Sequence, residues 1–176
     1  MFKGTLKPSN STQQKAVAIK MIHPHVESMV KTDMELLSYI ASMMDKVPSL
    51  EILSLGETMR QFADAMNNQL DLRLEARNLI KFTKKFSNDS WALFPSPIEG
   101  FVTKNVLVES LMEGVPIANF MQLKSEIGDG IHQLKMKLSD LGCRLILKMV
   151  FFDNFIHGDL HPGYSMKYSY ICCIMS

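Results

Sequence analysis

One carboxylate and two imidazoles are crowded into a short segment near the end of the chain, His157-Gly158-Asp159-Leu160-His161-Pro162-Gly163. The segment follows an apolar, helix-like run, and its Gly and Pro residues favour a tight loop. A carboxylate in such a loop can orient an attacking hydroxyl for phosphoryl transfer. The alternation of His157, Asp159 and His161 also admits a metal site, although the sequence offers no obvious further ligand. We predict a catalytic role for Asp159.

A lysine ends a short apolar run, Val17-Ala18-Ile19-Lys20. This matches the protein-kinase pattern in which a strand lysine reaches the α- and β-phosphates of a nucleotide. The alternative is an ordinary strand that ends in an exposed lysine, because a motif this short is common by chance. The phosphate-binding role is favoured by the other motifs, which follow in the order that a kinase requires.

Asp71 and Glu75 lie four residues apart in a helical segment and therefore share one helix face. One of them can then reach the strand lysine while the other stays near the phosphates or a metal. In the alternative interpretation the face is solvated, and Asp71 or Glu75 pairs with a neighbouring arginine. Both interpretations stay open at the level of sequence.

The periodicity of the first half of the chain predicts two strands followed by helices. Residues 16–22 read as a buried strand and residues 2–6 as its hairpin partner. Helical spacing of apolar residues follows over residues 26–44 and again over residues 55–86, with Asn67-Asn68 as a break. We expect these elements to position Lys20, Asp71 and Glu75.

The second half predicts a hairpin and a long helix that leads into the Asp159 loop. Residues 101–103 and 106–108 alternate as two paired strands, and Glu113-Gly114 marks a turn out of the sheet. Residues 127–149 form the cleanest amphipathic helix. The tail, residues 164–176, has no clear period, and we expect it to have no partner strand.

Composition places the chain among ordinary globular proteins, with 176 residues, 47% hydrophobic and 21% charged. Nineteen Lys and Arg against 18 Asp and Glu give a net charge of +1, so no nucleic-acid partner is predicted. Neither a membrane-spanning segment nor a targeting segment is expected in this chain. Cys143, Cys172 and Cys173 fit a reducing compartment. The 14 methionines are predicted to fill gaps in the core.

Taken together, these motifs resemble the UbiB, or aarF-domain-containing, family of atypical kinase-like proteins. The resemblance covers residues 1–163, and the sequence of the motifs is most similar to that of a mitochondrial animal member. The matching segments, in the family's order, are Val17-Ala18-Ile19-Lys20 with His23-Pro24, Leu70-Asp71-Leu72-Arg73-Leu74-Glu75-Ala76-Arg77-Asn78, Val106-Leu107-Val108-Glu109 with Glu113-Gly114, and Asp153-Asn154-Phe155 with the Asp159 loop.

The resemblance implies an α+β, protein-kinase-like fold. Residues 1–113 would form a small nucleotide-binding lobe with inserted helices, residues 114–163 the start of a helical lobe with the catalytic loop, and residues 164–176 a tail outside the resemblance. The implied cofactors are ATP and Mg²⁺. The implied role is kinase or ATPase work in coenzyme Q biosynthesis or mitochondrial lipid metabolism, in the mitochondrion, with coenzyme Q biosynthesis proteins or lipid as further partners.

The resemblance also assigns roles to residues. Lys20 would bind the nucleotide phosphates and Glu75 would be its helix partner. Asp71 matches the acidic residue of the family's Glu-x-Asp motif, in which Gln69 stands in place of the glutamate. Glu109 to Leu111 would form the hinge beside adenine, where backbone groups do the reading.

Asp159 would be the catalytic-loop aspartate. Tyr164 stands where the family has asparagine, no Asp-Phe-Gly follows before Ser176, and the family's Lys-x-Gly-Gln helix and Ala-rich loop would precede residue 1. We therefore expect a truncated form that lacks two metal-holding side chains and transfers phosphate poorly. The alternative is a catalytically inactive module that binds nucleotide or acts by its surface.

Overall fold

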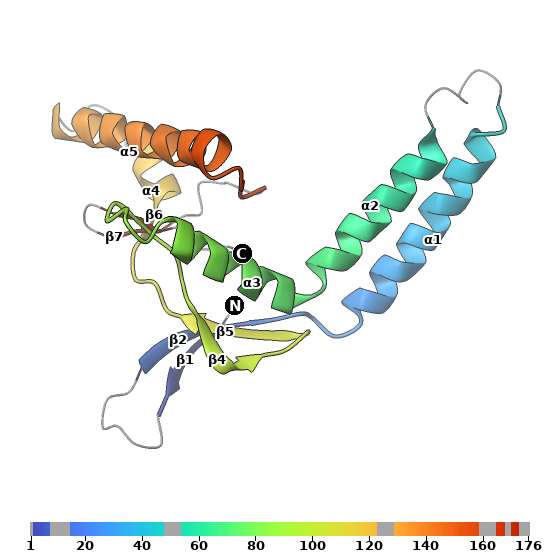
Figure 1. Ribbon diagram of the computed structural model, residues 1–176, viewed down its shortest axis with the longest axis horizontal. Helices are drawn as coiled ribbons and strands as arrows, with labels where there is room; N and C mark the ends of the chain where they lie inside the picture. The colour runs from blue at the N-terminus through green and yellow to red at the C-terminus, as the bar shows by residue number, and fades with distance from the viewer. Residues whose placement is uncertain are drawn as a thin grey trace.

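The computed structural model describes residues 2–7, 15–47, 54–122, 129–158, 165–167 and 170–172. Figure 1 shows a small sheet near the N-terminus, a helical hairpin that projects away from it, a central helix and a long helix on the other side of that central helix. The fold class is α+β, as predicted. Among the described helices, none has the length and apolar content needed to cross a membrane.

Four antiparallel strands form the first sheet, in the order β1-β2-β5-β4. Their bounds are β1 Phe2–Leu6, β2 Lys15–Met21, β4 Pro97–Val102 and β5 Val106–Ser110. The predicted hairpins over residues 2–22 and 101–108 are thus confirmed. In the central pair, Ala18 of β2 lies opposite Glu109 of β5, and Lys20 lies opposite Leu107. This register places all four side chains on one face of the sheet.

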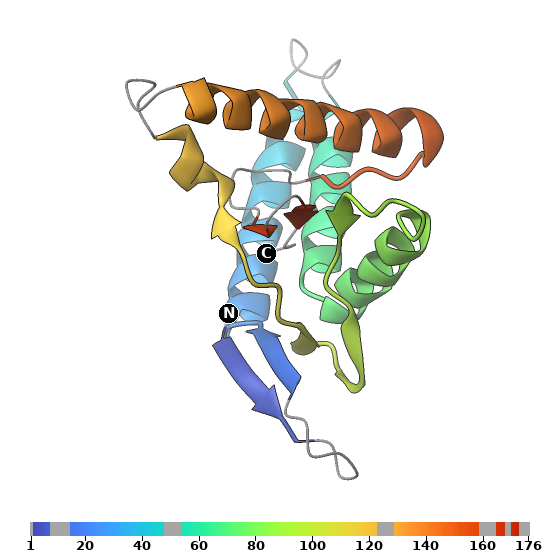
Figure 2. The same cartoon turned by 90° about the vertical axis from the view of Figure 1, so that its left-hand side faces the viewer.

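Two antiparallel helices, α1 (Val26–Met44) and α2 (Leu55–Gln69), form the hairpin that extends away from the body in Figure 1 and is seen behind it in Figure 2. Few of their side chains are buried, and Met29 and Met43 are 63% and 52% exposed. The prediction that the methionines fill the core is wrong here, because the hairpin meets the rest of the molecule only at one end. Met149, by contrast, is completely buried.

The predicted helix break is present, but it lies a few residues later than predicted, directly before the central helix α3 (Leu72–Lys85). The chain leaves the helical path at Leu70 and Asp71 rather than at Asn67-Asn68. The reason is local, because the carboxylate of Asp71 caps the new helix by accepting a hydrogen bond from the amide of Arg73.

One buried face of α3 contributes to two apolar clusters. Near its start, Leu72, Ala76 and Leu79 pack against Leu107 of the first sheet. Near its end, the helix joins an aromatic cluster with the helix α5 (Asp129–Leu147) and the π-helical turn η3 (Lys148–Phe152) that follows it. The members of this second cluster are Phe82, Phe86, Ala92, Phe94, Leu145 and Met149. The helix α3 therefore connects the sheet to the long helix.

Short strands form a second sheet, in the order β3-β8-β7-β6. Its strands are β3 (Ala92–Leu93), β6 (Val115–Pro116), β7 (Ser165–Lys167) and β8 (Tyr170–Cys172), and the short helix α4 (Ile117–Met121) follows β6. The prediction that residues 164–176 have no partner strand is therefore wrong. Strands of two or three residues are too short to show an alternating pattern.

Candidate functional site

The structure brings Lys20 and Glu75 together from positions 55 residues apart in the chain. The amine of Lys20 donates to both carboxylate oxygens of Glu75, at 3.0 Å and 2.8 Å. The two side chains are 24% and 16% exposed, so the pair is partly screened from water and still reachable from outside. An ammonium group fixed by such hydrogen bonds is already positioned to bind an anionic group.

Each member of this pair comes from a well-packed element. Lys20 follows the buried residues Val17 and Ala18 in β2, which is paired on both sides. Glu75 lies in the first turn of α3, next to Ala76, which packs on the sheet. The alternation of β2 and the packing of α3 thus direct both side chains into the space between sheet and helix.

Glu109 belongs to the same group of charges. It lies on β5, is 1% exposed, and its Oε2 atom has no hydrogen-bond partner among the residues that the structure describes. Burial and the negative charge of Glu75 raise the pKa of Glu109 to about 7, although the positive charge of Lys20 acts in the opposite direction. Sequence reasoning placed this residue in a hinge read by its backbone and missed its side chain.

Asp71 lies apart from these charges and acts in the structure of the helix. Its carboxylate caps α3 and forms an ion pair with Arg73 at 2.7 Å. The hydrogen bond from the Arg73 side chain lowers the pKa of Asp71 to about 2. Each of the two interpretations of this helix face is therefore correct for one residue. Asp71 pairs with a neighbouring arginine, and Glu75 contacts the strand lysine.

The predicted hinge, residues 109–111, begins inside β5, and its backbone is still paired at Leu111, one residue beyond the strand. The amide of Leu111 donates to the carbonyl of Ala16 at 3.3 Å, and the amide of Ser110 donates to Ser96 at 2.9 Å. These two amides are engaged within the protein, so a ligand that reads this segment through its backbone would use other groups.

The segment that leads to the Asp159 loop is anchored on α3. His157 is 9% exposed, and its ring centre lies 6.0 Å from that of Phe82, while Phe155 lies 4.6 Å from the same ring. The amide of Phe155 donates to the carbonyl of Met149 at 3.0 Å. Asp159 itself lies outside the described residues, as does His161. What is fixed is the approach to the loop, up to Gly158.

Upstream of this segment, Asp153 ends the π-helical turn. Lys148 forms ion pairs with Asp153 and Asp89 at 3.1 Å and 3.5 Å, and its amine lies 4.8 Å from the ring centre of Phe86. Burial disfavours the charged amine, but its contacts with Asp153 and Asp89 outweigh this and raise the pKa of Lys148. Within the described part of the chain, no three His, Cys, Asp or Glu side chains are grouped as a metal site would require.

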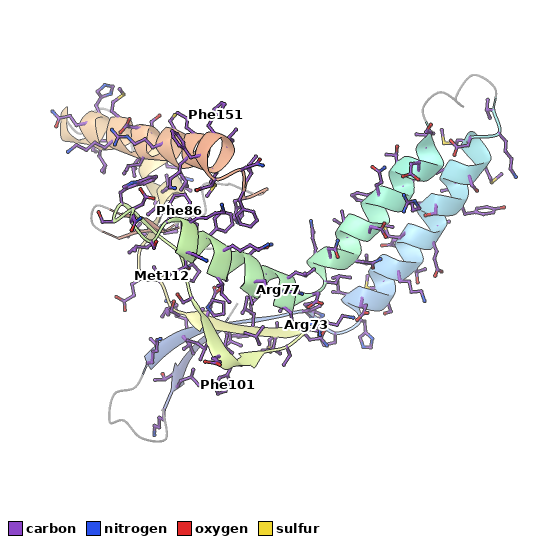
Figure 3. The ribbon with its side chains drawn as sticks, viewed as in Figure 1. Arg73, Arg77, Phe86, Phe101, Met112 and Phe151 are labelled. Atoms are coloured by element: carbon purple, nitrogen blue, oxygen red, sulfur yellow. The ribbon has the colours of Figure 1, made fainter. Side chains whose placement is uncertain are left out.

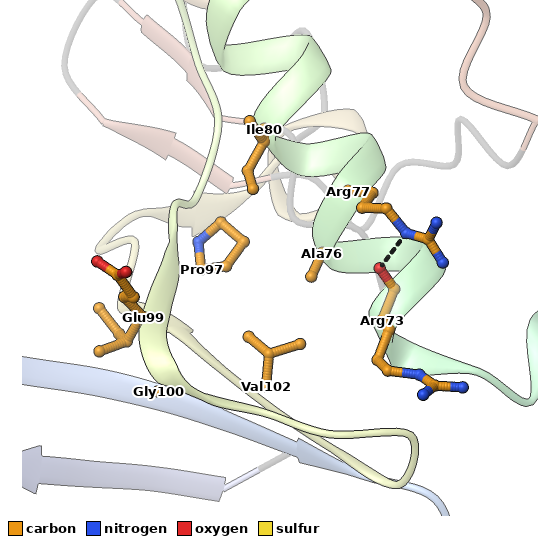
Figure 4. Close-up of a pocket in the computed structure, with 9 residues that line it drawn as sticks. Arg73, Ala76, Arg77, Ile80, Pro97, Glu99, Gly100 and Val102 are labelled. Atoms are coloured by element: carbon orange, nitrogen blue, oxygen red, sulfur yellow. Dashed lines mark hydrogen bonds between the residues drawn. The ribbon is translucent and has the colours of Figure 1, made fainter.

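A groove of about 790 Å³ lies on another side of α3, between this helix and β4 (Figure 4). Ile80, Pro97 and Val102 line it together with Arg73 and Arg77, which Figure 3 shows near the start of α3. The Nε atom of Arg77 donates to the carbonyl of Arg73. Lys20, Glu75 and Glu109 do not line this groove, so the charge cluster is separate from it.

Comparison with solved structures defines the class of fold. The chain superposes on a protein from Mycobacterium tuberculosis, solved in complex with erythromycin, with a TM-score of 0.75 over 97% of this chain and 41% of that protein. The sequence identity is 18%, so this likeness concerns the fold alone. The kinase-like fold expected from the sequence is thus shown.

Residues 1–166 match the ABC1 atypical kinase-like domain, and the chain belongs to this family. A mitochondrial ABC1 family protein of Saccharomyces cerevisiae is 37% identical over 146 residues, which cover 83% of this chain and 22% of that protein. A probable serine/threonine-protein kinase of Dictyostelium discoideum is 34% identical, covering 85% and 21%. A probable protein kinase UbiB of Glaesserella parasuis is 31% identical, covering 85% and 26%. The chain thus spans about a fifth to a quarter of these relatives' length.

Proposed function

We propose that this chain is the nucleotide-binding part of an atypical kinase-like protein that uses ATP, for phosphotransfer or for hydrolysis. The observation that carries this proposal is the ion pair between Lys20 on β2 and Glu75 on α3, at 2.8 Å. It is supported by membership of the ABC1 family and by names of relatives that describe probable protein kinases.

In this proposal the amine of Lys20 holds the α- and β-phosphates of the nucleotide, and Glu75 keeps the amine in position. The pair fits this task because the lysine is fixed by two hydrogen bonds and remains 24% exposed. Asp159 would orient the acceptor hydroxyl or water. Bound Mg²⁺ would neutralise phosphate charge, and we assign it no ligand, because no suitable group of side chains occurs within the described residues.

We further propose a role in coenzyme Q biosynthesis or mitochondrial lipid metabolism, in the mitochondrion. This rests on the resemblance to the UbiB group and on two fungal relatives, 37% and 35% identical, that are named mitochondrial. Partners would then be coenzyme Q biosynthesis proteins or lipid, in addition to the nucleotide.

Measurement of magnesium-dependent ATP turnover separates the enzyme from a binding module. For an enzyme we expect turnover that is lost in Asp159→Ala, whereas an inactive module would be stabilised by ATP without turnover. A chain that neither turns over ATP nor binds it would contradict the proposal. The Asp64→Ala variant is a suitable control, because Asp64 is a 66% exposed carboxylate of α2 that pairs with Arg60 of the same helix.

A further inference from the structure

The side chain of Glu109 shares a face of the sheet with Lys20. Glu109 lies opposite Ala18 in the register of β2 and β5, and Lys20 lies opposite Leu107. Residues two apart on a strand point to the same side, and diagonal neighbours across an antiparallel pair lie about 7–8 Å apart. Leu107 packs against α3, so this is the face that α3 covers. Glu109 and Glu75 therefore approach the Lys20 amine from two different elements.

Glu109 is the least satisfied charged group of this cluster. It is 1% exposed, and its Oε2 atom accepts no hydrogen bond from any residue that the structure describes. A buried carboxylate without a full set of partners is costly, so the neutral, protonated form is favoured. The pKa of Glu109, about 7, follows from that burial and from the charge of Glu75. Its protonation therefore changes near neutral pH.

Within the part of the chain that the structure describes, two charged side chains shift the pKa of Glu109. Lys20 faces it from β2 and Glu75 faces it from α3, while β4 places the uncharged Pro97 opposite it. With Glu109 protonated, Lys20 and Glu75 cancel and the cluster has no net charge. With Glu109 ionised, the cluster carries one net negative charge in a poorly hydrated place.

We propose that Glu109 is a positioning residue that controls how strongly the Lys20 site holds phosphate. Protonated Glu109 leaves the lysine with a single counter-ion, whereas ionised Glu109 competes for the lysine and repels an incoming phosphate. The inference rests on the proposed nucleotide site and extends it to a residue whose side chain had no role there. By linkage, phosphate that binds beside Lys20 favours uptake of a proton by Glu109.

The test is the dissociation constant of the full chain for ATP between about pH 6 and pH 8.5, for the wild type and Glu109→Gln. ATP itself titrates in this range. The informative quantity is therefore the dissociation constant of the wild type divided by that of Glu109→Gln at each pH. We expect a ratio near one at low pH, rising on the order of tenfold at high pH, as one extra charge about 8 Å away would produce.

Glu99→Gln is the matched control, because it removes the same charge from an exposed position on the neighbouring strand β4. The dissociation constant of this variant for ATP should equal that of the wild type at every pH. Glu109→Leu, which is also uncharged, should follow Glu109→Gln, so that the result does not depend on one variant's folding. Calorimetry in buffers of different ionisation enthalpy should detect proton uptake with ATP near pH 7.5 in the wild type and less in both Glu109 variants.

A wild type and Glu109→Gln that keep a constant ratio across this pH range would overturn the role of Glu109 and leave the nucleotide site intact. If the wild type and all variants fail to bind ATP at any pH, the nucleotide site itself is contradicted, and the role of Glu109 with it. The two failures are thus distinguishable.

Discussion

At the scale of single residues, two carboxylates on neighbouring elements have opposite surroundings. Asp71 is bonded to Arg73, which lowers its pKa to about 2 and keeps it ionised. Glu109 is buried beside another carboxylate, which raises its pKa to about 7. The same functional group therefore acts as a permanent helix cap in one place and as a titrating group in the other.

The free energy of unfolding should depend on pH through Glu109. Between its ordinary pKa of 4.5 and about 7, the folded protein binds a proton that the unfolded chain has released, so stability falls as pH rises through this window. In Glu109→Gln this loss should be absent. Urea unfolding should find the variant more stable than the wild type at about pH 8.5, by roughly 3 kcal/mol, and close to it at about pH 4.5.

Glu99→Gln provides the comparison, because Glu99 is exposed. It should change the free energy of unfolding by less than about 0.5 kcal/mol at both pH values. If the free energies of unfolding of the wild type and Glu109→Gln differ by the same amount at both pH values, Glu109 does not titrate with a raised pKa in the folded protein.

At this scale the sequence predicts part of the site. The spacing of Asp71 and Glu75 and the position of Lys20 at a strand end anticipate the Lys20–Glu75 pair. Spacing alone does not decide which carboxylate reaches the lysine, because Arg73 competes for Asp71. Glu109 was missed as a side chain, although a carboxylate at the end of the apolar run Val106-Leu107-Val108 carried the signal. Its burial depends on α3, which lies far away in sequence.

At the scale of secondary-structure elements, Phe82 joins α3 to β3 and to the segment that leads to Asp159. Phe82 is 1% exposed and contacts Phe94 and Phe155, at ring distances of 5.1 Å and 4.6 Å. Phe82→Ala should lower the free energy of unfolding by about 3–5 kcal/mol, because it leaves a cavity between α3 and the segment leading to Asp159.

Phe151 is the matched control for this change, since it is 75% exposed at the π-helical turn. Phe151→Ala should cost less than about 0.5 kcal/mol in a urea titration. Equal losses for the two variants would mean that Phe82 is not part of a packed junction.

Two glycines should respond to substitution with opposite signs. Gly100 in β4 has a φ of +80°, and although an added Cβ would meet nothing within 4 Å, other residues rarely adopt this conformation. Gly142 lies inside α5, also with open space around it. Thermal unfolding should show Gly100→Ala destabilised by about 1 kcal/mol and Gly142→Ala stabilised by about the same amount. Changes of the same sign would contradict this backbone assignment.

The elements were predicted best where they are long or strongly patterned. The β1–β2 hairpin and the helix that starts at Val26 follow the expected ranges closely, whereas β4 begins at Pro97, four residues before the predicted strand. The helix break was placed too early because Asn67-Asn68 suggests a turn, while the Asp71 cap decides where α3 begins. The strands at Ser165–Lys167 and Tyr170–Cys172 depend on distant partners, β6 and β3, which no local pattern reveals.

At the scale of the whole molecule, α3 connects the sheet that carries Lys20 to the α5 region that leads to the catalytic loop. The apolar cluster around Leu79 joins the helix to the sheet, and the cluster around Phe82 joins it to α5 and the His157 segment. The sheet that carries Lys20 and the segment that leads toward Asp159 therefore both pack on α3. The predicted boundary near Glu113 lies where the chain leaves the first sheet, and it stays a prediction.

The proposed function depends most on Lys20 as the residue that holds the phosphates of a bound nucleotide. The direct measurement is the dissociation constant for ATP at about pH 6, where Glu109 is largely protonated, in the wild type, Lys20→Met and Lys104→Met. Lys104 lies in the turn between β4 and β5, pairs with Glu27 at 2.6 Å and is 43% exposed, so its variant removes an equivalent charge and ion pair at another place. We predict that Lys20→Met weakens ATP binding by at least about tenfold, while Lys104→Met leaves it within about twofold. Equal affinity in all three proteins would contradict a phosphate-binding role for Lys20.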